Sequence, residues 1–303
     1  MAITIQYERP VSHAAHWARR LALFSCLLFI AAVLSHRFGP LTTPHFLVLA
    51  GFAAAMAGLA VLLAAFGLMR LWQIGARGGK ASFMALLLSL LPLGVAGAAT
   101  YSYFYNPALY DVTTDAAMPP PWLAVPAVQQ DWLPRSSVVT PRDREVQLEA
   151  YPGLSGRRYE GALDRVYQGV RKVATAYGIT ITVEDGLDNI LADLEDLVVD
   201  PAKTARSAAL ASEVPIPEAR PLETPLTPRI GGPGDVLLQG EWRSPVFGFR
   251  FDVVIRLREE AETTLVDMRA ASRYGPHDLG MGARMVEGYL KALDAELLGI
   301  AGD

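Results

Sequence analysis

The second half of the chain contains the stretch Phe249-Arg-Phe-Asp-Val-Val-Ile-Arg-Leu-Arg258. Its odd-numbered side chains, from Phe249 to Leu257, are all apolar, whereas Asp252, Arg256 and Arg258 alternate with them. Side chains two residues apart lie on the same face of a β-strand. The stretch therefore predicts a strand with one face in a hydrophobic core and a polar face on the other side.

Strands are predicted on both sides of this stretch, at 236–243 and at 263–272. In the second run, Asp267 and Arg269 alternate with apolar residues and so lie on the polar face. Arg273 joins them if the strand continues. Three adjacent strands with one apolar face each indicate a sheet that is packed on one side.

Periodicity also predicts the elements that flank these strands. Apolar residues three and four positions apart indicate helices, whereas short β-branched runs indicate strands. Gly178 supplies the C-terminal cap of one helix, and Asp278 begins another. The predicted elements are strands at 146–151 and 179–183, helices at 159–177 and 279–298, and an inserted amphipathic helix at 184–199 followed by a Pro-rich loop.

The order of elements predicts a membrane-anchored α+β protein. Sequential short strands with flanking helices imply an antiparallel sheet whose apolar face is covered by the two longer helices, an arrangement like the helix-grip fold. The predicted parts are a three-helix transmembrane anchor (1–105), a Pro-rich extended strap (106–144), and an α+β domain (145–303) with a helix-plus-loop insertion at 184–234.

The anchor is predicted from the concentration of apolar residues in the first third of the chain. The chain of 303 residues is 51% hydrophobic and 19% charged, with a mean hydropathy of +0.25. Apolar segments occupy 17–35, 46–69 and 81–101. A bilayer core about 30 Å thick needs about 20 residues of helix. A cleaved signal peptide is the weaker interpretation of the first segment, because two more spans follow it directly.

The basic residues of the anchor predict its orientation. They are Arg9, Arg19 and Arg20 before the first span, Arg37 after it, and Arg70, Arg77 and Lys80 between the second and third spans. Loops rich in Lys and Arg stay in the cytoplasm. We therefore expect a bacterial inner-membrane protein with a cytoplasmic N-terminus and a periplasmic C-terminal domain.

Charge and composition exclude several classes of function. Residues 1–101 carry a net charge of +6 and residues 102–303 a net charge of −10, which argues against nucleic acid as a partner. The single cysteine, Cys26, lies in an apolar run, so no disulfide framework or Cys-based zinc site is expected. His277 is the only histidine after residue 101, and it does not form a catalytic set with its neighbour Asp278. We expect no catalytic residues, metal or cofactor.

The polar face of the sheet is the candidate ligand site. It carries Asp252, Arg256, Arg258, Asp267, Arg269 and Arg273. One interpretation is an exposed face with cross-strand ion pairs, each contributing about 0–1 kcal/mol. The other is an anion site, because guanidinium groups bind phosphate or carboxylate through two parallel hydrogen bonds. A lipid headgroup or an envelope glycan is then the expected ligand.

Two motifs resemble the Domain of Unknown Function 1499 (DUF1499) family. One is the stretch from Phe249 to Arg256 followed by 266–280, and the other is Asp111-Val-Thr-Thr-Asp115 with two prolines after it. The resemblance covers roughly 107–298 and implies N-terminal membrane spans, but no agreed activity. The motif residues are Asp111, Asp115, Ser272, Gly275, Asp278 and Gly280. The chain departs from the family pattern at Phe251, where Asp is usual, and at Gly282, where Asn is usual.

Three functions are compatible with these patterns. The first is a non-enzymatic domain that binds an anionic lipid or glycan, or a membrane or periplasmic protein, beside the bilayer. The second is an enzyme on envelope lipids or glycans that uses Asp252 or Asp278 as general acid or base. The third is a small subunit of a membrane complex, in which small residues of the second span such as Ala54 and Gly58 form the contact surface.

Overall fold

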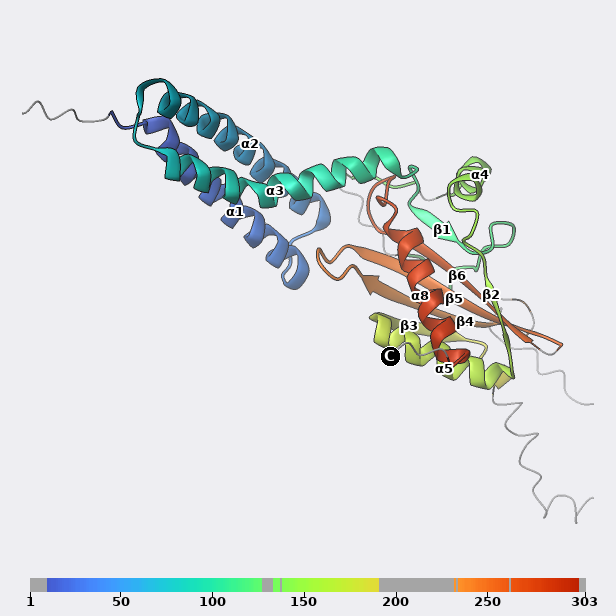
Figure 1. Cartoon of the computed structure of the whole chain (residues 1–303). Coiled ribbons are helices and arrows are strands. Elements are labelled where there is room, and N and C mark those ends of the chain that lie inside the picture. Colours follow the sequence, from blue (N-terminus) through green and yellow to red (C-terminus); the bar gives the residue numbers. More distant parts are fainter. Residues whose placement is uncertain are drawn as a thin grey trace, which may run out of the picture.

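The computed structural model describes residues 10–126, 133–136, 138–190, 232, 234–261 and 263–299. Three long helices form one unit and an α+β domain follows it (Figure 1). The helices are α1 (His13–Phe38), α2 (Thr43–Ile74) and α3 (Gly79–Tyr105), and all three are long and apolar enough to cross a membrane. The predicted three-helix anchor is confirmed by length and composition.

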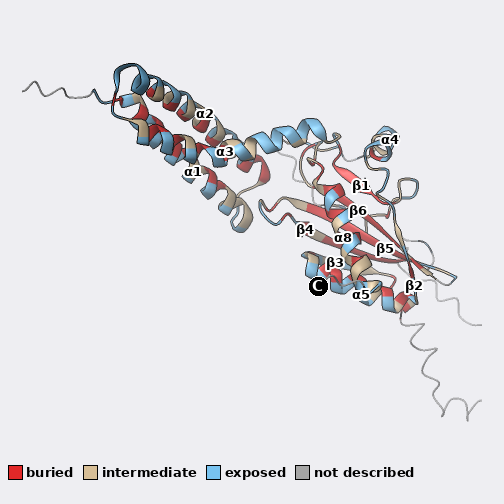
Figure 2. Ribbon diagram, viewed as in Figure 1, coloured by how far each residue is buried: buried red, intermediate tan, exposed pale blue. Residues whose placement is uncertain are grey.

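The three helices pack through alanine. Ala18, Ala22, Ala60, Ala64 and Ala85 form a buried cluster between them, and such small side chains let helix backbones approach closely. Large apolar side chains such as Phe52, Leu62 and Leu90 are exposed, and exposed stretches, pale blue in Figure 2, occur along all three helices. This arrangement suits a bilayer, where lipid chains cover the exposed apolar surface. A Cβ at Gly58 meets nothing within 4 Å, so this residue of the predicted contact surface is not packed within the chain.

Helix α3 leaves the bundle after Pro92. A proline inside a helix removes one backbone hydrogen bond and commonly produces a bend. Beyond Pro92 the helix diverges from α1 and α2 and continues toward the α+β domain (Figure 1). Positions in this half are open, and a Cβ at Gly94 or Gly97 would meet nothing within 4 Å.

The α+β domain is built on an antiparallel sheet. Its order is β1-β6-β5-β4-β3, and β2 also pairs with β6. In the β5–β6 register, Arg256 lies opposite Asp267 and Asp252 lies opposite Ala271. The strands are β1 (Asp111–Thr113), β2 (Arg157–Glu160), β3 (Ile179–Asp185), β4 (Val236–Arg243), β5 (Arg250–Glu260) and β6 (Thr263–Ser272).

Two helices cover the apolar face of this sheet, as predicted. They are α5 (Leu163–Tyr177) and α8 (Met281–Leu297), and α5 ends at Gly178 in the left-handed conformation. Leu163, Val170, Phe251, Ile255, Met268 and Tyr289 are among the buried core residues. Burial of side chains of this size contributes about 1.5–3 kcal/mol each. The α+β architecture with a one-sided core is therefore confirmed.

The strand predicted at 146–151 is wrong, because these residues belong to helix α4 (Pro141–Ala150). Thr140 and Asp143 form a reciprocal capping box, and Pro141 occupies the first turn, where its missing N–H has no cost. These signals at the start of the helix outweigh a short alternating run. The helix also turns Gln147 inward, where it is buried against β1.

Three other boundaries differ from the predictions. Tyr159 and Glu160 belong to β2, so the helix predicted from 159 begins at Leu163. The predicted strap contains a strand, β1, which pairs with β6. Residues 184 and 185 end β3, and helical turns begin at Leu187. The rest of the predicted insertion, from 191 to 231, lies outside the described residues.

Candidate functional site

The polar face of the sheet is buried rather than exposed. Asp252, Arg256 and Asp267 are each no more than 4% exposed, because the chain between β1 and Pro126 crosses this face. Gln239 of β4 binds that crossing segment through three hydrogen bonds to the backbones of Leu123 and Ala124, at 2.8–2.9 Å. The interpretation of this face as an exposed surface is therefore wrong, because the crossing segment covers it.

Cross-strand ion pairs fill the face, as one interpretation predicted. Arg256 donates to Asp267 at 2.6 Å and to Asp115 of the crossing segment at 3.1 Å. Arg273 binds Asp252 at 2.7 Å. Each of these guanidiniums therefore has a carboxylate beside it on the same face. Arg258 pairs with Asp235 at 3.2 Å, and Arg273 also reaches Glu241 at 3.0 Å.

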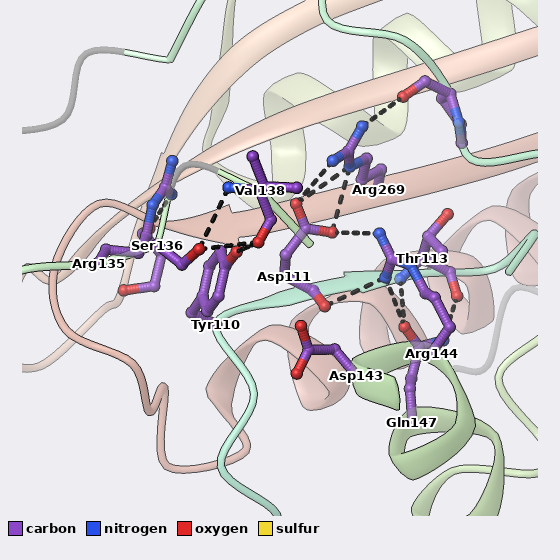
Figure 3. A network of polar contacts seen from close by, with 12 residues as sticks. Tyr110, Asp111, Thr113, Arg135, Ser136, Val138, Asp143, Arg144, Gln147 and Arg269 are labelled. Atoms are coloured by element: carbon purple, nitrogen blue, oxygen red, sulfur yellow. Dashed lines mark hydrogen bonds and ion pairs between the residues drawn. The ribbon is translucent and has the colours of Figure 1, made fainter. Parts of the chain in front are cut away.

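Asp111 is the centre of a second group of contacts, drawn in Figure 3. Its carboxylate accepts two-pronged hydrogen bonds from Arg269, at 2.9–3.1 Å, and one from Arg144 at 2.8 Å. Gln147 of α4 exchanges hydrogen bonds with the backbone of Thr113 and accepts one from Arg144. This group fastens α4 and β1 to β6.

Arg269 also holds the crossing segment in place. Its Nη1 donates to the backbone oxygen of Pro120 at 3.1 Å, and its guanidinium stacks on the ring of Trp122 at 4.8 Å. Such a cation–π contact contributes about 0.5–2 kcal/mol. One arginine therefore connects the sheet, the first strand and the covering segment.

These contacts bear on the prediction that the face binds an anion. An added anion must compete with Asp111, Asp115, Asp252 or Asp267 for guanidiniums that already have partners. The Nε atom of Arg256 is buried and has no acceptor among the described residues. Binding of an anion here stays a prediction, and a ligand entering from solvent requires displacement of the cover.

The family-like motif at 266–280 ends in the turn between β6 and α8. Asp278 accepts hydrogen bonds from the amides of Gly280 and Gly282 at 2.7 and 2.8 Å. Burial raises its pKa, although these amides oppose the shift. Gly275 and Gly280 adopt φ of +70°, which favours glycine, and Ser272 donates to the oxygen of Tyr274. The backbone geometry of this turn therefore accounts for the residue types found at these four motif positions.

His277 of the same turn connects the domain to the third helix. Its Nε2 donates to the backbone oxygens of Tyr103 and Asn106 at 3.0 and 3.2 Å, and its ring stacks on Tyr103 at 4.7 Å. Its Nδ1 accepts from the amide of Leu279 at 2.9 Å. The histidine thus serves as a link at the end of α3.

A second link joins the β4–β5 turn to the first two helices. His36 Nδ1 donates to the backbone oxygen of Phe247 at 2.6 Å, and its Nε2 accepts from the hydroxyl of Thr43 at 3.0 Å. Phe46 stacks on His36 and also contacts Phe249. The domain therefore touches the helical unit at two places.

An apolar cleft lies between these two links, and we call it the junction cleft. It consists of two adjoining cavities of about 470 and 570 Å³ that share Leu47, Ala99, Phe249, Leu279 and Met281. The first cavity reaches the helices through Phe29, Gly51 and Val95, and the second reaches the turn at 274–279. A space of this size is typical of a small-molecule site.

The lining of the junction cleft is mainly apolar but also contains charged groups. Arg284 donates to the oxygen of Leu279 and has no carboxylate within ion-pair distance among the described residues. Arg250 lies 3.6 Å from Glu241, a loose contact for an ion pair. Asp278 is a buried carboxyl of the lining whose oxygens accept hydrogen bonds from Gly280 and Gly282. The cleft thus combines a mainly apolar lining with two guanidiniums and one carboxyl that is engaged by backbone amides.

Sequence reasoning did not identify this cleft. Its walls come from α2, α3, the β4–β5 turn and the turn before α8, which are far apart in the sequence. Two closely spaced aromatic residues at the β4–β5 turn, Phe247 and Phe249, were the available signal in the sequence. Within the described part of the chain, no group of three or more His, Cys, Asp or Glu side chains is placed to hold a metal ion.

Comparison with known proteins gives one match. The family model described as "Protein of unknown function (DUF1499)" matches residues 111–293. This range includes the entire sheet, from β1 to β6, and most of α8, while the three apolar helices lie outside it. No curated protein and no solved structure matches the chain.

Proposed function

The chain belongs to the DUF1499 family, whose function is unknown, and from this premise we propose that it is a non-enzymatic, membrane-anchored domain that binds one amphiphilic lipid. The hydrocarbon chains lie in the junction cleft, and the head group lies at the rim. The conclusion rests on one observation: an apolar cleft is shared by the membrane-spanning helices and the folded domain.

The lining of the cleft supports a hydrocarbon ligand. Leu47, Gly51, Val95 and Ala99 come from α2 and α3, and Phe249 comes from the domain. Burial of an apolar chain against such side chains is favourable by about 25 cal/mol per Å² of covered surface. The divergence of α3 beyond Pro92 opens the bundle on the side where the cleft lies, so a lipid enters from the bilayer.

The rim supports an acidic head group. Arg284 has no carboxylate partner among the described residues, and Arg250 has only a distant one. Guanidinium groups bind phosphate and carboxylate through charge-assisted hydrogen bonds. A neutral apolar molecule leaves Arg284 without an anionic partner and Arg250 with only its loose contact to Glu241, so an anionic amphiphile fits the cleft better.

The location that fits this proposal is the outer face of a bacterial inner membrane. Among the described residues, Arg19, Arg20, Arg70, Arg77 and Lys80 lie near the ends of the helices that are away from the domain. The positive-inside rule then assigns those ends to the cytoplasm and the domain to the periplasm. The ligand is in that case a lipid of the outer leaflet.

A catalytic role has less support in the geometry. Asp252 is buried and bound in a two-pronged contact by Arg273, and Asp278 accepts two backbone N–H groups. A general acid or base needs access to a substrate within hydrogen-bond reach. Both carboxylates that an enzyme would use are occupied by structural contacts.

The proposal is tested by filling the cleft. Gly51 lines the cleft, and a Cβ there would meet nothing within 4 Å, so Gly51→Phe occupies the lipid space without a backbone clash. Gly58→Phe is the matched control, because Gly58 lies on the same helix with equally open surroundings but does not line the cleft.

Full-length protein is extracted gently, and bound lipids are counted by native mass spectrometry. We expect the wild type and Gly58→Phe to retain one anionic lipid and Gly51→Phe to lose it at unchanged melting temperature. Equal lipid retention by all three proteins, or retention of random bilayer lipids only, would overturn the proposal.

A further inference from the structure

A separate polar pocket lies at the edge of the sheet nearest the end of α1, and we call it the edge pocket. Its volume is about 440 Å³. Side chains from four elements line it: Arg37 at the end of α1, Tyr177 of α5, Thr180 of the edge strand β3, and Trp242 and Arg243 of β4. It shares no lining residue with the junction cleft.

Arg37 places this pocket at the level of the membrane surface. The residue lies in the last turn of a helix that is apolar enough to cross the bilayer, and the segment beyond it turns back into α2. It forms no ion pair among the described residues. Its guanidinium lies 5.7 Å from the centre of the Phe38 ring, and a Cβ added at Gly248 would meet its backbone and side chain. A cation at this position faces the layer of lipid head groups.

The surroundings of the pocket carry a surplus of positive charge. Glu241 is its acidic member, and three guanidiniums compete for it: Arg243 at 2.8 Å, Arg273 at 3.0 Å and Arg250 at 3.6 Å. Burial raises the pKa of Glu241, but these arginines outweigh that effect and lower it. Glu241 therefore stays ionised and neutralises one of the three charges, and Asp252 neutralises a second through its 2.7 Å contact with Arg273. One guanidinium of the three, together with Arg37, is left as the positive surplus.

The remaining polar groups of the pocket suit an anion with several oxygens. Thr180 is exposed on an edge strand, and its hydroxyl can donate to a bound oxygen. Arg243 is 43% exposed, so its free donors remain open on the pocket side. Two guanidiniums and a hydroxyl match the number of oxygens on a phosphate group.

We propose that the edge pocket binds a phosphate group at the membrane surface, held by Arg37 and Arg243. The phosphate belongs either to a lipid head group or to a free phosphate ion, and both present the same oxygens to the same guanidiniums. The edge pocket and the junction cleft share no lining residue, although guanidiniums are the anion-binding groups in both.

The test compares Arg37→Gln and Arg243→Gln with a matched control, Arg158→Gln. Arg158 is an exposed arginine that pairs with Glu260 at the opposite end of β5, so its loss removes the same charge elsewhere.

Full-length proteins are placed in nanodiscs of phosphatidylcholine with or without phosphatidylglycerol, and retained lipids are counted by native mass spectrometry. Inorganic phosphate is titrated separately by calorimetry in detergent. It has no hydrocarbon chain to occupy the junction cleft, and loss of its binding in Arg37→Gln and Arg243→Gln assigns it to the edge pocket.

We expect the wild type and Arg158→Gln to bind the phosphate probe, and each pocket variant to bind it at least about tenfold more weakly. Retention of phosphatidylglycerol with the same sensitivity identifies a lipid head group, whereas binding of inorganic phosphate alone identifies a free ion. If either arginine variant fails to fold, Thr180→Val serves in its place and should weaken binding in the same direction. Equal binding by all variants, or no binding of either probe to the wild type, would refute the site.

Discussion

Removal of the Asp111 carboxylate tests whether the polar face of the sheet stabilises the fold. Asp111 is 4% exposed and pairs with two guanidiniums that are themselves only 12–13% exposed. Asp111→Ala leaves both Arg144 and Arg269 without a carboxylate in a place that water hardly reaches. Loss of one partner of a buried ion pair costs about 3–5 kcal/mol, because the remaining charge stays buried.

The remaining contacts place the expected loss at the lower end of this range. In the variant, Arg269 keeps its hydrogen bond to the oxygen of Pro120 and its cation–π contact with Trp122. Arg144 keeps its hydrogen bond to Gln147. We therefore expect a loss of about 3 kcal/mol in the free energy of unfolding. For a domain of this size about 1 kcal/mol lowers the melting temperature by about 2–4 °C, so the expected drop is about 6–12 °C.

The assay is thermal unfolding of the full-length protein in detergent, followed by tryptophan fluorescence, with chemical denaturation for the free energy. Glu260→Ala is the control, since it breaks the exposed pair with Arg158 and should leave the melting temperature unchanged. If Asp111→Ala lowers the free energy of unfolding by less than about 1 kcal/mol, the ion pairs of Asp111 contribute no more than ordinary surface ion pairs do. Such a result would refute the inference that the covering segment keeps water from the face.

Two further outcomes are expected. An alkaline phosphatase fusion after Tyr105 should be active, because the topology that we propose places this position in the periplasm. An inactive fusion there, together with an active one after Gly78, would reverse the topology. Burial raises the pKa of Asp278 above the ordinary 3.8, so its stabilising contribution is present below about pH 3.8 and is lost as the pH rises through the folded pKa. Denaturation of wild type and Asp278→Asn across this range should therefore show the variant gaining relative stability with rising pH, and a pH-independent difference would contradict the assignment.

The elements predicted well are those whose signal is local. Alternation from Phe249 to Leu257 identifies a strand because side chains two residues apart share a face wherever the strand lies. Twenty apolar residues identify a span because the thickness of the bilayer is constant. The helix predicted around Val170 and closed by Gly178 likewise depends on spacing and a cap within one segment.

The elements predicted poorly depend on partners elsewhere in the chain. The run from Val146 to Tyr151 alternates like a strand, yet the capping box at Thr140 starts a helix that turns Gln147 toward β1. β1 has only three residues, too few for a periodic signal. It is a strand because β6 offers it an unpaired edge.

Local patterns in the amino-acid sequence were enough to predict the three apolar helices, the one-sided sheet, its two covering helices and the alternation that puts Asp252, Arg256, Asp267 and Arg269 on one face. Whether that face meets water depends on where the segment after β1 crosses the sheet. The junction cleft and the edge pocket each need side chains from several separate parts of the chain. Burial, ion pairing and the shape of a cavity therefore became visible in the folded chain alone, because periodicity describes one segment and carries no information about its neighbours in space.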